Sequence, residues 1–140
     1  TQYPKGFFDE VLKQLIVPAG VQAGFKVETA NKKGSDVIQS TIINDLCNAD
    51  LVICDLTDHN PNALFELGWR IAIDRPVALI RAKGTSAIFD VDHMLRVYDY
   101  NSCLWRSTLE HDIPALTEHI QATWGGRDSD KSYRKILMTH

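Results

Sequence analysis

The chain has 140 residues, a formal net charge of −3, 44% hydrophobic residues and 24% charged residues. These values fit one globular domain and exclude bulk disorder. Without a basic excess there is no electrostatic case for nucleic acid. No apolar run approaches the roughly 20 residues of a membrane span. We therefore expect a cytoplasmic domain with neither nucleic acid nor membrane as a partner.

The cysteines and histidines give no pattern of a disulfide framework or a metal site. The three cysteines are Cys47, Cys54 and Cys103, and an odd number without motif spacing argues against paired disulfides. Cys54 lies in an apolar run, which indicates a small core residue. The five histidines are scattered, and no Cys/His cluster has metal-ligand spacing. We predict no metal and no cofactor.

The first third of the chain predicts a helix, a strand and a second helix. Apolar residues at helical spacing predict a helix over 6–17 that stops near Pro18 and Gly20. The alternating segment 25–30 predicts a short strand. Asp36 can cap the second helix, whose buried face would hold Ile38, Ile42, Ile43 and Leu46.

The central part predicts two buried strands joined by a helix. The continuous apolar run 51–56 suits a strand that is covered on both faces, as in a parallel sheet. Asn60 and Pro61 favour the start of a helix, which should end near Asp74, before Pro76. Residues 77–80 form the next apolar run and predict the second buried strand.

The last third predicts a loop, a strand and a closing helix. Residues 83–92 have a loop composition, and residues 96–100 predict a fourth strand. An apolar stripe predicts a helix over 109–124, which tolerates Pro114 only near its start or at a bend. We expect one α/β domain over 1–126 and a polar tail over 127–140.

Strands that alternate with helices predict an α/β fold of the three-layer, flavodoxin-like or Rossmann-like kind. In this fold a parallel sheet carries helices on both faces, and ligands bind at the carboxyl ends of the strands. This rule directs attention to the polar segment that follows the strand over 51–56. Asp55 closes that strand, and the polar residues after it are Thr57, Asp58, His59, Asn60 and Asn62.

Glu66 is the residue in this region that most strongly suggests chemistry. Its neighbours in sequence are apolar, and a carboxylate in such surroundings can have a raised pKa. At a sugar anomeric carbon it can stabilise or attack an oxocarbenium-like centre. We expect Asp55 and Glu66 to face one crevice. The alternative for Glu66 is an ordinary exposed ion pair with Arg70, four residues further on.

The other residues have simpler alternatives too. Asn60 can be only a helix cap, and Asp55 can be only a brace for the turn that follows it. Asp58 and His59 can be solvated turn residues. Trp69 is either part of a helix core or a platform for a ligand.

The segment 49–80, with Asp55, the run Glu66-Leu67-Gly68, and Arg75-Pro76-Val77, resembles the nucleoside 2-deoxyribosyltransferase-like group, which overlaps structurally with TIR-like domains. The resemblance extends over about 35–124. It implies cleavage of an N-glycosidic bond in a nucleoside, a nucleotide or NAD. By this resemblance Glu66 is the catalytic carboxylate, and Asp55 is an acid that positions the substrate.

Two features depart from the pattern of this group. The transferases place an Asp near the start of the Glu helix, where this chain has Asn60, and an amide cannot protonate a departing base. The pattern also begins with a β-strand, whereas this chain opens with Thr1 to Gly6 and then a predicted helix. We therefore expect a sheet whose first strand is missing or supplied from elsewhere.

Three hypotheses follow for the function. The first is an N-glycosyl hydrolase or transferase that uses Glu66 and Asp55, with Thr57, Asp58, His59, Asn60, Asn62 and Trp69 holding a nucleotide-type or nucleoside-type small molecule. The second is a non-catalytic module that senses a nucleotide or associates with itself as a homo-oligomer. The third is a structural interaction domain without a ligand. The position of Glu66, in a polar-lined crevice or exposed beside Arg70, discriminates between them.

Overall fold

The computed structural model describes residues 3–28, 48–87 and 95–128. In this part of the chain three strands form one parallel sheet with the order β1-β2-β3. The predictions of strands over 51–56, 77–80 and 96–100 are confirmed. The strands are β1 (Val52–Asp55), β2 (Val77–Ala82) and β3 (Val97–Tyr100).

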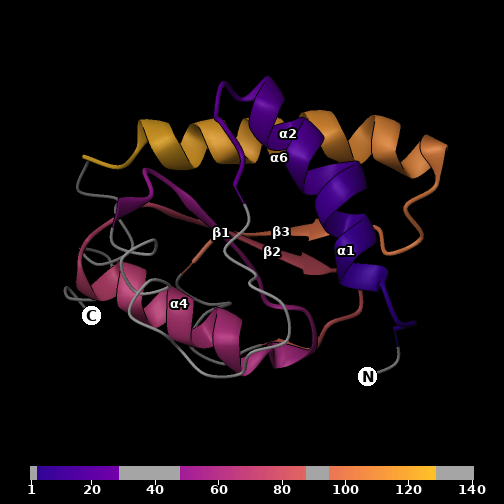
Figure 1. Ribbon diagram of the computed structural model, residues 1–140, viewed down its shortest axis with the longest axis horizontal. Helices are drawn as coiled ribbons and strands as arrows, with labels where there is room; N and C mark the ends of the chain where they lie inside the picture. The colour runs from indigo at the N-terminus through magenta and orange to yellow at the C-terminus, as the bar shows by residue number, and fades with distance from the viewer. Residues whose placement is uncertain (1–2, 29–47, 88–94, 129–140) are drawn as a thin grey trace.

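Helices pack on both faces of this sheet (Figure 1). The helix α4 (Pro61–Ala72) joins β1 to β2 and covers one face, where Cys54, Leu67 and Leu79 form a core. The N-terminal helix and α6 (Arg106–Gly125) cover the other face, where Leu15 and Ile80 lie in a second core. The α/β fold is confirmed at this level.

The N-terminal helix continues past the point where the sequence predicted its end. It runs through α1 (Phe7–Val11), the π-helical turn η1 (Leu12–Ile16) and α2 (Val17–Gln22). Pro18 falls in the first turn of α2, after the π-helical turn, where the hydrogen-bond pattern of the helix changes. Gly20 does not end the helix either. It lets Val27 approach closely, because a Cβ at this position would lie 2.6 Å from Val27 Cγ2.

The strand predicted over 25–30 is wrong for its described part, since residues 25–28 form no strand. The alternating apolar side chains contact helices instead of a neighbouring strand. Phe25 packs edge-on against Trp124 of α6, with ring centroids 5.5 Å apart, and Val27 packs on Gly20 of α2. The period-2 pattern therefore marks a connecting segment whose apolar side chains pack on α6 and α2.

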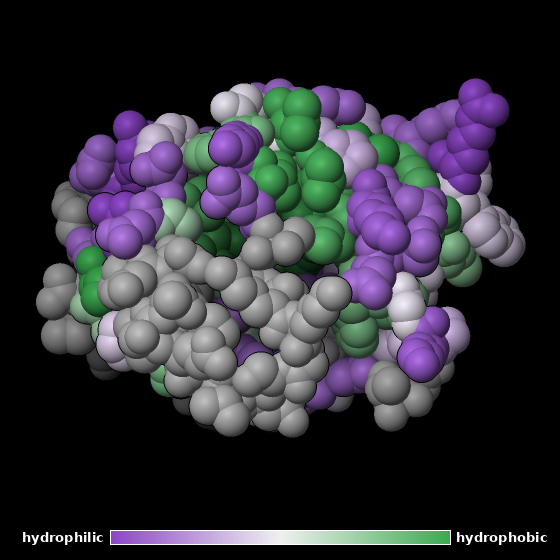
Figure 2. Space-filling view, viewed as in Figure 1, coloured by the Kyte–Doolittle hydropathy of each residue, from purple (hydrophilic) through white to green (hydrophobic). Residues whose placement is uncertain are grey.

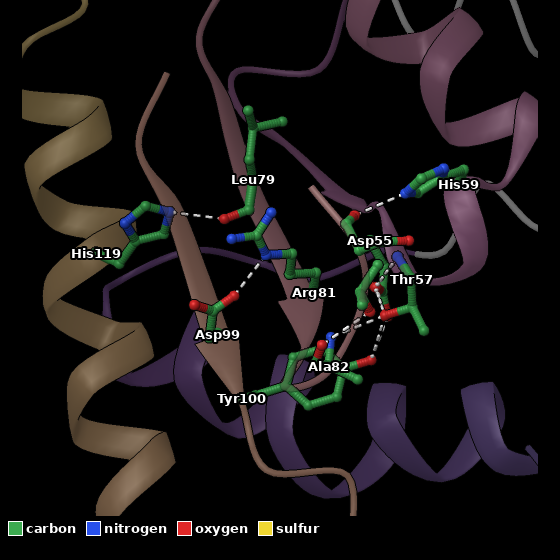
Figure 3. Close-up of polar contacts among 11 residues, drawn as sticks. Asp55, Thr57, His59, Leu79, Arg81, Ala82, Asp99, Tyr100 and His119 are labelled. Carbon is green, nitrogen blue, oxygen red and sulfur yellow. Dashed lines mark hydrogen bonds and ion pairs between the residues drawn. The ribbon is translucent and has the colours of Figure 1, made fainter. Parts of the chain in front are cut away.

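The helix α6 is tied to the sheet by polar contacts as well as by its core residues. His119 Nε2 lies 3.0 Å from the Leu79 carbonyl oxygen (Figure 3). Asp112 is fully buried and accepts hydrogen bonds from the Tyr98 hydroxyl and the backbone N–H of Asn101. Pro114 lies inside this helix, away from its start, and its side chain is exposed. The prediction of a helix over 109–124 is confirmed, although the helix begins earlier.

Some predictions fall outside the described residues. These are the helix that Asp36 would cap, the second half of the loop over 83–92, and the tail beyond residue 128. Among the helices that the structure describes, none combines the length and the apolar character needed to cross a membrane.

Candidate functional site

The three strands end in polar groups that contact one another. Asp55 Oδ1 accepts hydrogen bonds from the Thr57 amide (3.0 Å) and the Thr57 hydroxyl (2.6 Å). Asp55 Oδ2 accepts one from the Tyr100 hydroxyl (2.6 Å), and Thr57 Oγ1 accepts one from the Ala82 amide (2.9 Å). Figure 3 shows these four residues converging, and we call them the strand-end network. The network joins the carboxyl ends of all three strands.

The carboxylate of Asp55 is therefore engaged inside the protein. Burial raises the pKa of Asp55, and the hydrogen bonds from Thr57 and Tyr100 oppose this shift. Burial, with the nearby charge of Asp55, also raises the pKa of Tyr100, so its hydroxyl remains a neutral donor. Thr57 is fully buried, which prevents it from contacting a ligand in this conformation. The alternative of Asp55 as a brace matches this geometry.

The turn after β1 has an unusual backbone conformation. Asp58 (φ 60°) and His59 (φ 53°) both lie in the left-handed region. Non-glycine residues held there cost on the order of 1 kcal/mol each, and such strain is often stored near functional sites. Asp58 is exposed, and His59 Nε2 lies 2.7 Å from the carbonyl oxygen of Ser86, in the loop after β2. The turn is thus held against the next loop.

The start of α4 is capped by Asn60. Its side-chain oxygen accepts a hydrogen bond from the backbone N–H of Asn62 at 2.8 Å, so the alternative of Asn60 as a cap is confirmed. The side chain of Asn62 is exposed and that of Asn60 is too. Both can contact a polar molecule that approaches this end of the helix, where the dipole favours negative groups.

Glu66 lies on the side of α4 that faces the sheet. It is partly buried, between the buried residues Ala63, Leu67 and Arg70 of the same helix. Its Oε2 lies 3.9 Å from the Cys54 thiol of β1. Burial raises the pKa of Glu66, and the thiol contact partly offsets the shift. Within the described part of the chain this thiol is its single polar contact, and no described residue occupies the remaining acceptor positions of its two oxygens.

The alternative of an exposed Glu66–Arg70 ion pair is wrong, because Arg70 is fully buried. Its guanidinium group donates to backbone carbonyl oxygens of the segments that lead into β1 and β2. The distances are 2.7 Å to Ala49, 3.1 Å to Asp50 and 2.7 Å to Pro76. Arg70 thus fastens α4 to the amino ends of both strands.

Asp55 and Glu66 lie on opposite faces of the sheet. Successive residues of a strand point to opposite faces. Cys54 points toward α4 and contacts Glu66, whereas Asp55 points toward Tyr100, which belongs to the core under α1 and α6. The expectation that both carboxylates face one crevice is therefore wrong.

Trp69 lies beside Phe65 on α4. It is partly buried, and its ring stacks on that of Phe65, with centroids 6.0 Å apart. Phe65 is 39% exposed. This aromatic pair offers an apolar surface next to Glu66 along the helix. That Trp69 is a platform for a ligand stays a prediction.

Two partners of the site residues were missed by sequence reasoning. Tyr100 ends β3 as Asp55 ends β1, so the rule that carboxyl ends of parallel strands meet could have identified it. Cys54 was interpreted as a core residue, and it is 1% exposed, but its contact with Glu66 depends on how α4 lies on the sheet.

Other features of the described chain contain none of the predicted site residues. A shallow groove of about 450 Å³ lies between the N-terminal helix and the start of α6, lined by Gln14, Leu109 and Ile113 among others. No group of three His, Cys, Asp or Glu side chains in the described segments is arranged to hold a metal ion.

Comparison with known proteins gives no match: no family model, no curated protein and no solved structure is similar to the chain at the level that would mark a relative.

Proposed function

We propose that this domain cleaves the N-glycosidic bond of a nucleoside, a nucleotide or NAD, with Glu66 as the catalytic carboxylate. One observation carries the proposal. Glu66 is a partly buried carboxylate that faces the sheet and has a thiol as its single polar contact within the described chain. A carboxylate that only braces the fold would be saturated with hydrogen bonds, as Asp55 is. Glu66 therefore keeps acceptor capacity for a ligand.

The chemistry expected of Glu66 is the stabilisation of positive charge at the anomeric carbon. As the bond to the base breaks, the sugar becomes oxocarbenium-like, and a carboxylate on one face can stabilise it or form a bond to it. A partly apolar pocket strengthens this electrostatic contribution. The raised pKa of Glu66 implies that its ionised form, which this step requires, dominates only at a higher pH than for an ordinary glutamate.

The part proposed for Asp55 follows from the strand-end network. It positions the turn after β1, and through the turn the start of α4, without contacting the substrate. The exposed polar groups near that end of α4, Asp58, Asn60 and Asn62, are the residues that can hold sugar hydroxyls or a phosphate. His59, held by Ser86, closes the turn on its other side.

The wider proposal places the domain among three-layer, flavodoxin-like or Rossmann-like folds of the cytoplasm, and among the deoxyribosyltransferase-like and TIR-like proteins that its sequence resembles. Helices on both faces of a parallel sheet support the fold, and thiols without a disulfide at Cys54 and Cys103 support a reducing compartment.

The test is chromatographic detection of a released base or nicotinamide from NAD and a panel of nucleosides and nucleotides. We compare the wild-type protein with Glu66→Gln, which keeps the shape of the side chain. The matched control is Glu118→Gln, at an exposed position of α6. We expect release by the wild type and the control, and a loss of at least about a hundredfold in Glu66→Gln. Release that Glu66→Gln leaves unchanged would reject Glu66 as the catalytic group.

A second candidate function is a non-catalytic module that senses a nucleotide or associates with itself. Two observations favour it. Asp55 cannot reach the face on which Glu66 lies, so no second acid from β1 assists it there. In addition, hydrophobic side chains gather over α2 on the face shown in Figure 2, where Val21 is 59% exposed. Binding of a nucleotide or formation of an oligomer, with no product released from any substrate, would favour this function.

A further inference from the structure

The contact between Cys54 and Glu66 joins two elements at the point where the proposed reaction takes place. Cys54 lies in β1, next to Asp55, and is 1% exposed. Its Sγ lies 3.9 Å from Oε2 of Glu66, within the range of a weak S–H···O hydrogen bond. A buried thiol with a carboxylate beside it remains protonated, because both burial and the negative charge oppose the thiolate. The thiol is therefore a donor and not a nucleophile.

We infer that the Cys54 thiol is the positioning group for the Glu66 carboxylate. It donates its S–H to Oε2 across the interface between α4 and β1, and so holds one oxygen toward the strand and leaves the other for the sugar. This inference rests on the proposed function for its catalytic meaning. Cys54 acts through Glu66 and does not contact the substrate.

Within the described residues, the Cys54 thiol is the polar group that contacts the Glu66 carboxylate. On the two strands that pack against α4, the apolar residues of this face are Val52, Val77 and Leu79. Alternation along β2 places Arg81 on the same face, where its guanidinium group forms an ion pair with Asp99 at 2.6 Å. On α4 itself the titratable neighbour is Arg70, whose guanidinium group is directed to carbonyl oxygens at the amino ends of the strands. Asp55 affects the Cys54 thiol from the opposite face of the sheet. A substitution at Cys54 should therefore change the pKa of Glu66.

The test is the pKa of Glu66, measured by NMR titration of its side-chain carboxyl carbon in the wild type, Cys54→Ala and Cys54→Ser. Glu66→Gln identifies the resonance. In Cys54→Ala we expect the pKa of Glu66 to rise by about half a unit, as fits the loss of one weak donor. In Cys54→Ser the hydroxyl replaces the donor, and the pKa should lie below that of the alanine variant. Equal pKa values in all three proteins would overturn the inference.

A second measurement needs no substitution at Cys54, so it applies even where both variants fold poorly. The S–H stretching band in the Raman spectrum of the protein should move as Glu66 ionises, and this movement should be absent in Glu66→Gln. A band that does not respond to pH would overturn the inference.

Activity separates this inference from the function on which it rests. If base is released, the limb of the pH–rate profile that reports Glu66 should move to higher pH in Cys54→Ala and return in Cys54→Ser. A profile that stays fixed overturns the inference and leaves the proposed function standing. Conversely, a shifted pKa in a protein that releases no base supports the coupling of Cys54 to Glu66 and rejects the proposed function.

Discussion

Asp55 and Glu66 are acids on opposite faces of one sheet, and their surroundings differ in one decisive respect. Asp55 receives three hydrogen bonds from Thr57 and Tyr100, and so joins β1 to the end of β3. Glu66 contacts a single thiol within the described chain. Burial raises the pKa of both acids, so a raised pKa does not distinguish a brace from a reactive group. The number of hydrogen bonds that each carboxylate accepts within the described residues does distinguish them.

The largest expected effect is on stability, at Asp55. Asp55→Ala leaves the Thr57 and Tyr100 donors without their acceptor, and we expect a loss of about 3 kcal/mol in the free energy of unfolding. Urea denaturation at pH 7 measures it. Asp55→Asn, which keeps one acceptor oxygen, is the matched variant and should lose less. A loss below about 0.5 kcal/mol in Asp55→Ala, the size usual for surface changes, would mean that the network does not brace the sheet.

Tyr100→Phe should have the next largest effect. It removes one donor to the Asp55 carboxylate and keeps the ring in the core. We expect a loss of about 1.5 kcal/mol, as is usual for a hydrogen bond to a charged group. Urea denaturation at pH 7 measures it. A loss below about 0.5 kcal/mol would argue against a special contribution of the Tyr100 hydroxyl.

The smallest effect on the free energy of unfolding is expected for substitution of Glu66. The direction of the Glu66 pKa shift determines whether this residue stabilises or destabilises the fold at a given pH. Because the folded-state pKa of Glu66 is raised, its ionised form disfavours folding at neutral pH. Its stabilising contribution is complete below the unfolded-state pKa of about 4.3 and is lost as pH rises through the folded-state pKa.

We therefore expect Glu66→Gln to be as stable as the wild type at pH 7, or slightly more stable, within about 0.5 kcal/mol. The wild type should gain stability relative to the variant as pH falls toward about 4. Urea denaturation of both proteins across this range measures the difference. A wild type that instead loses stability relative to Glu66→Gln on acidification would show that the ionised carboxylate stabilises the fold, as a brace would.

Much of the fold could be predicted from the sequence, because short sequence patterns within each element identified it. Continuous apolar runs identified β1 and β2, and the Asn60-Pro61 pair identified the start of α4. The end predicted at Pro18 was wrong because a π-helical turn precedes it, and this turn has no sequence signature of its own.

The candidate site could be predicted only as a set of residues. A continuous apolar run such as 51–56 does not indicate which of its residues face which helix, so the separation of Asp55 from Glu66 was hidden. The spacing of Glu66 and Arg70 indicated a surface pair. The carbonyl oxygens that bury Arg70 come from segments distant in sequence, at Ala49 and Pro76, and only the packed structure brings them together.

The most direct test of this division between the two acids is the rate of base or nicotinamide release per folded molecule in Glu66→Gln and in Tyr100→Phe. The account predicts that Glu66→Gln keeps its stability and loses release, whereas Tyr100→Phe loses stability and, once corrected for the folded fraction, releases base within a few-fold of the wild type. Release that survives in Glu66→Gln but disappears in folded Tyr100→Phe would contradict it, and would move the chemistry to the face of the sheet on which Asp55 lies.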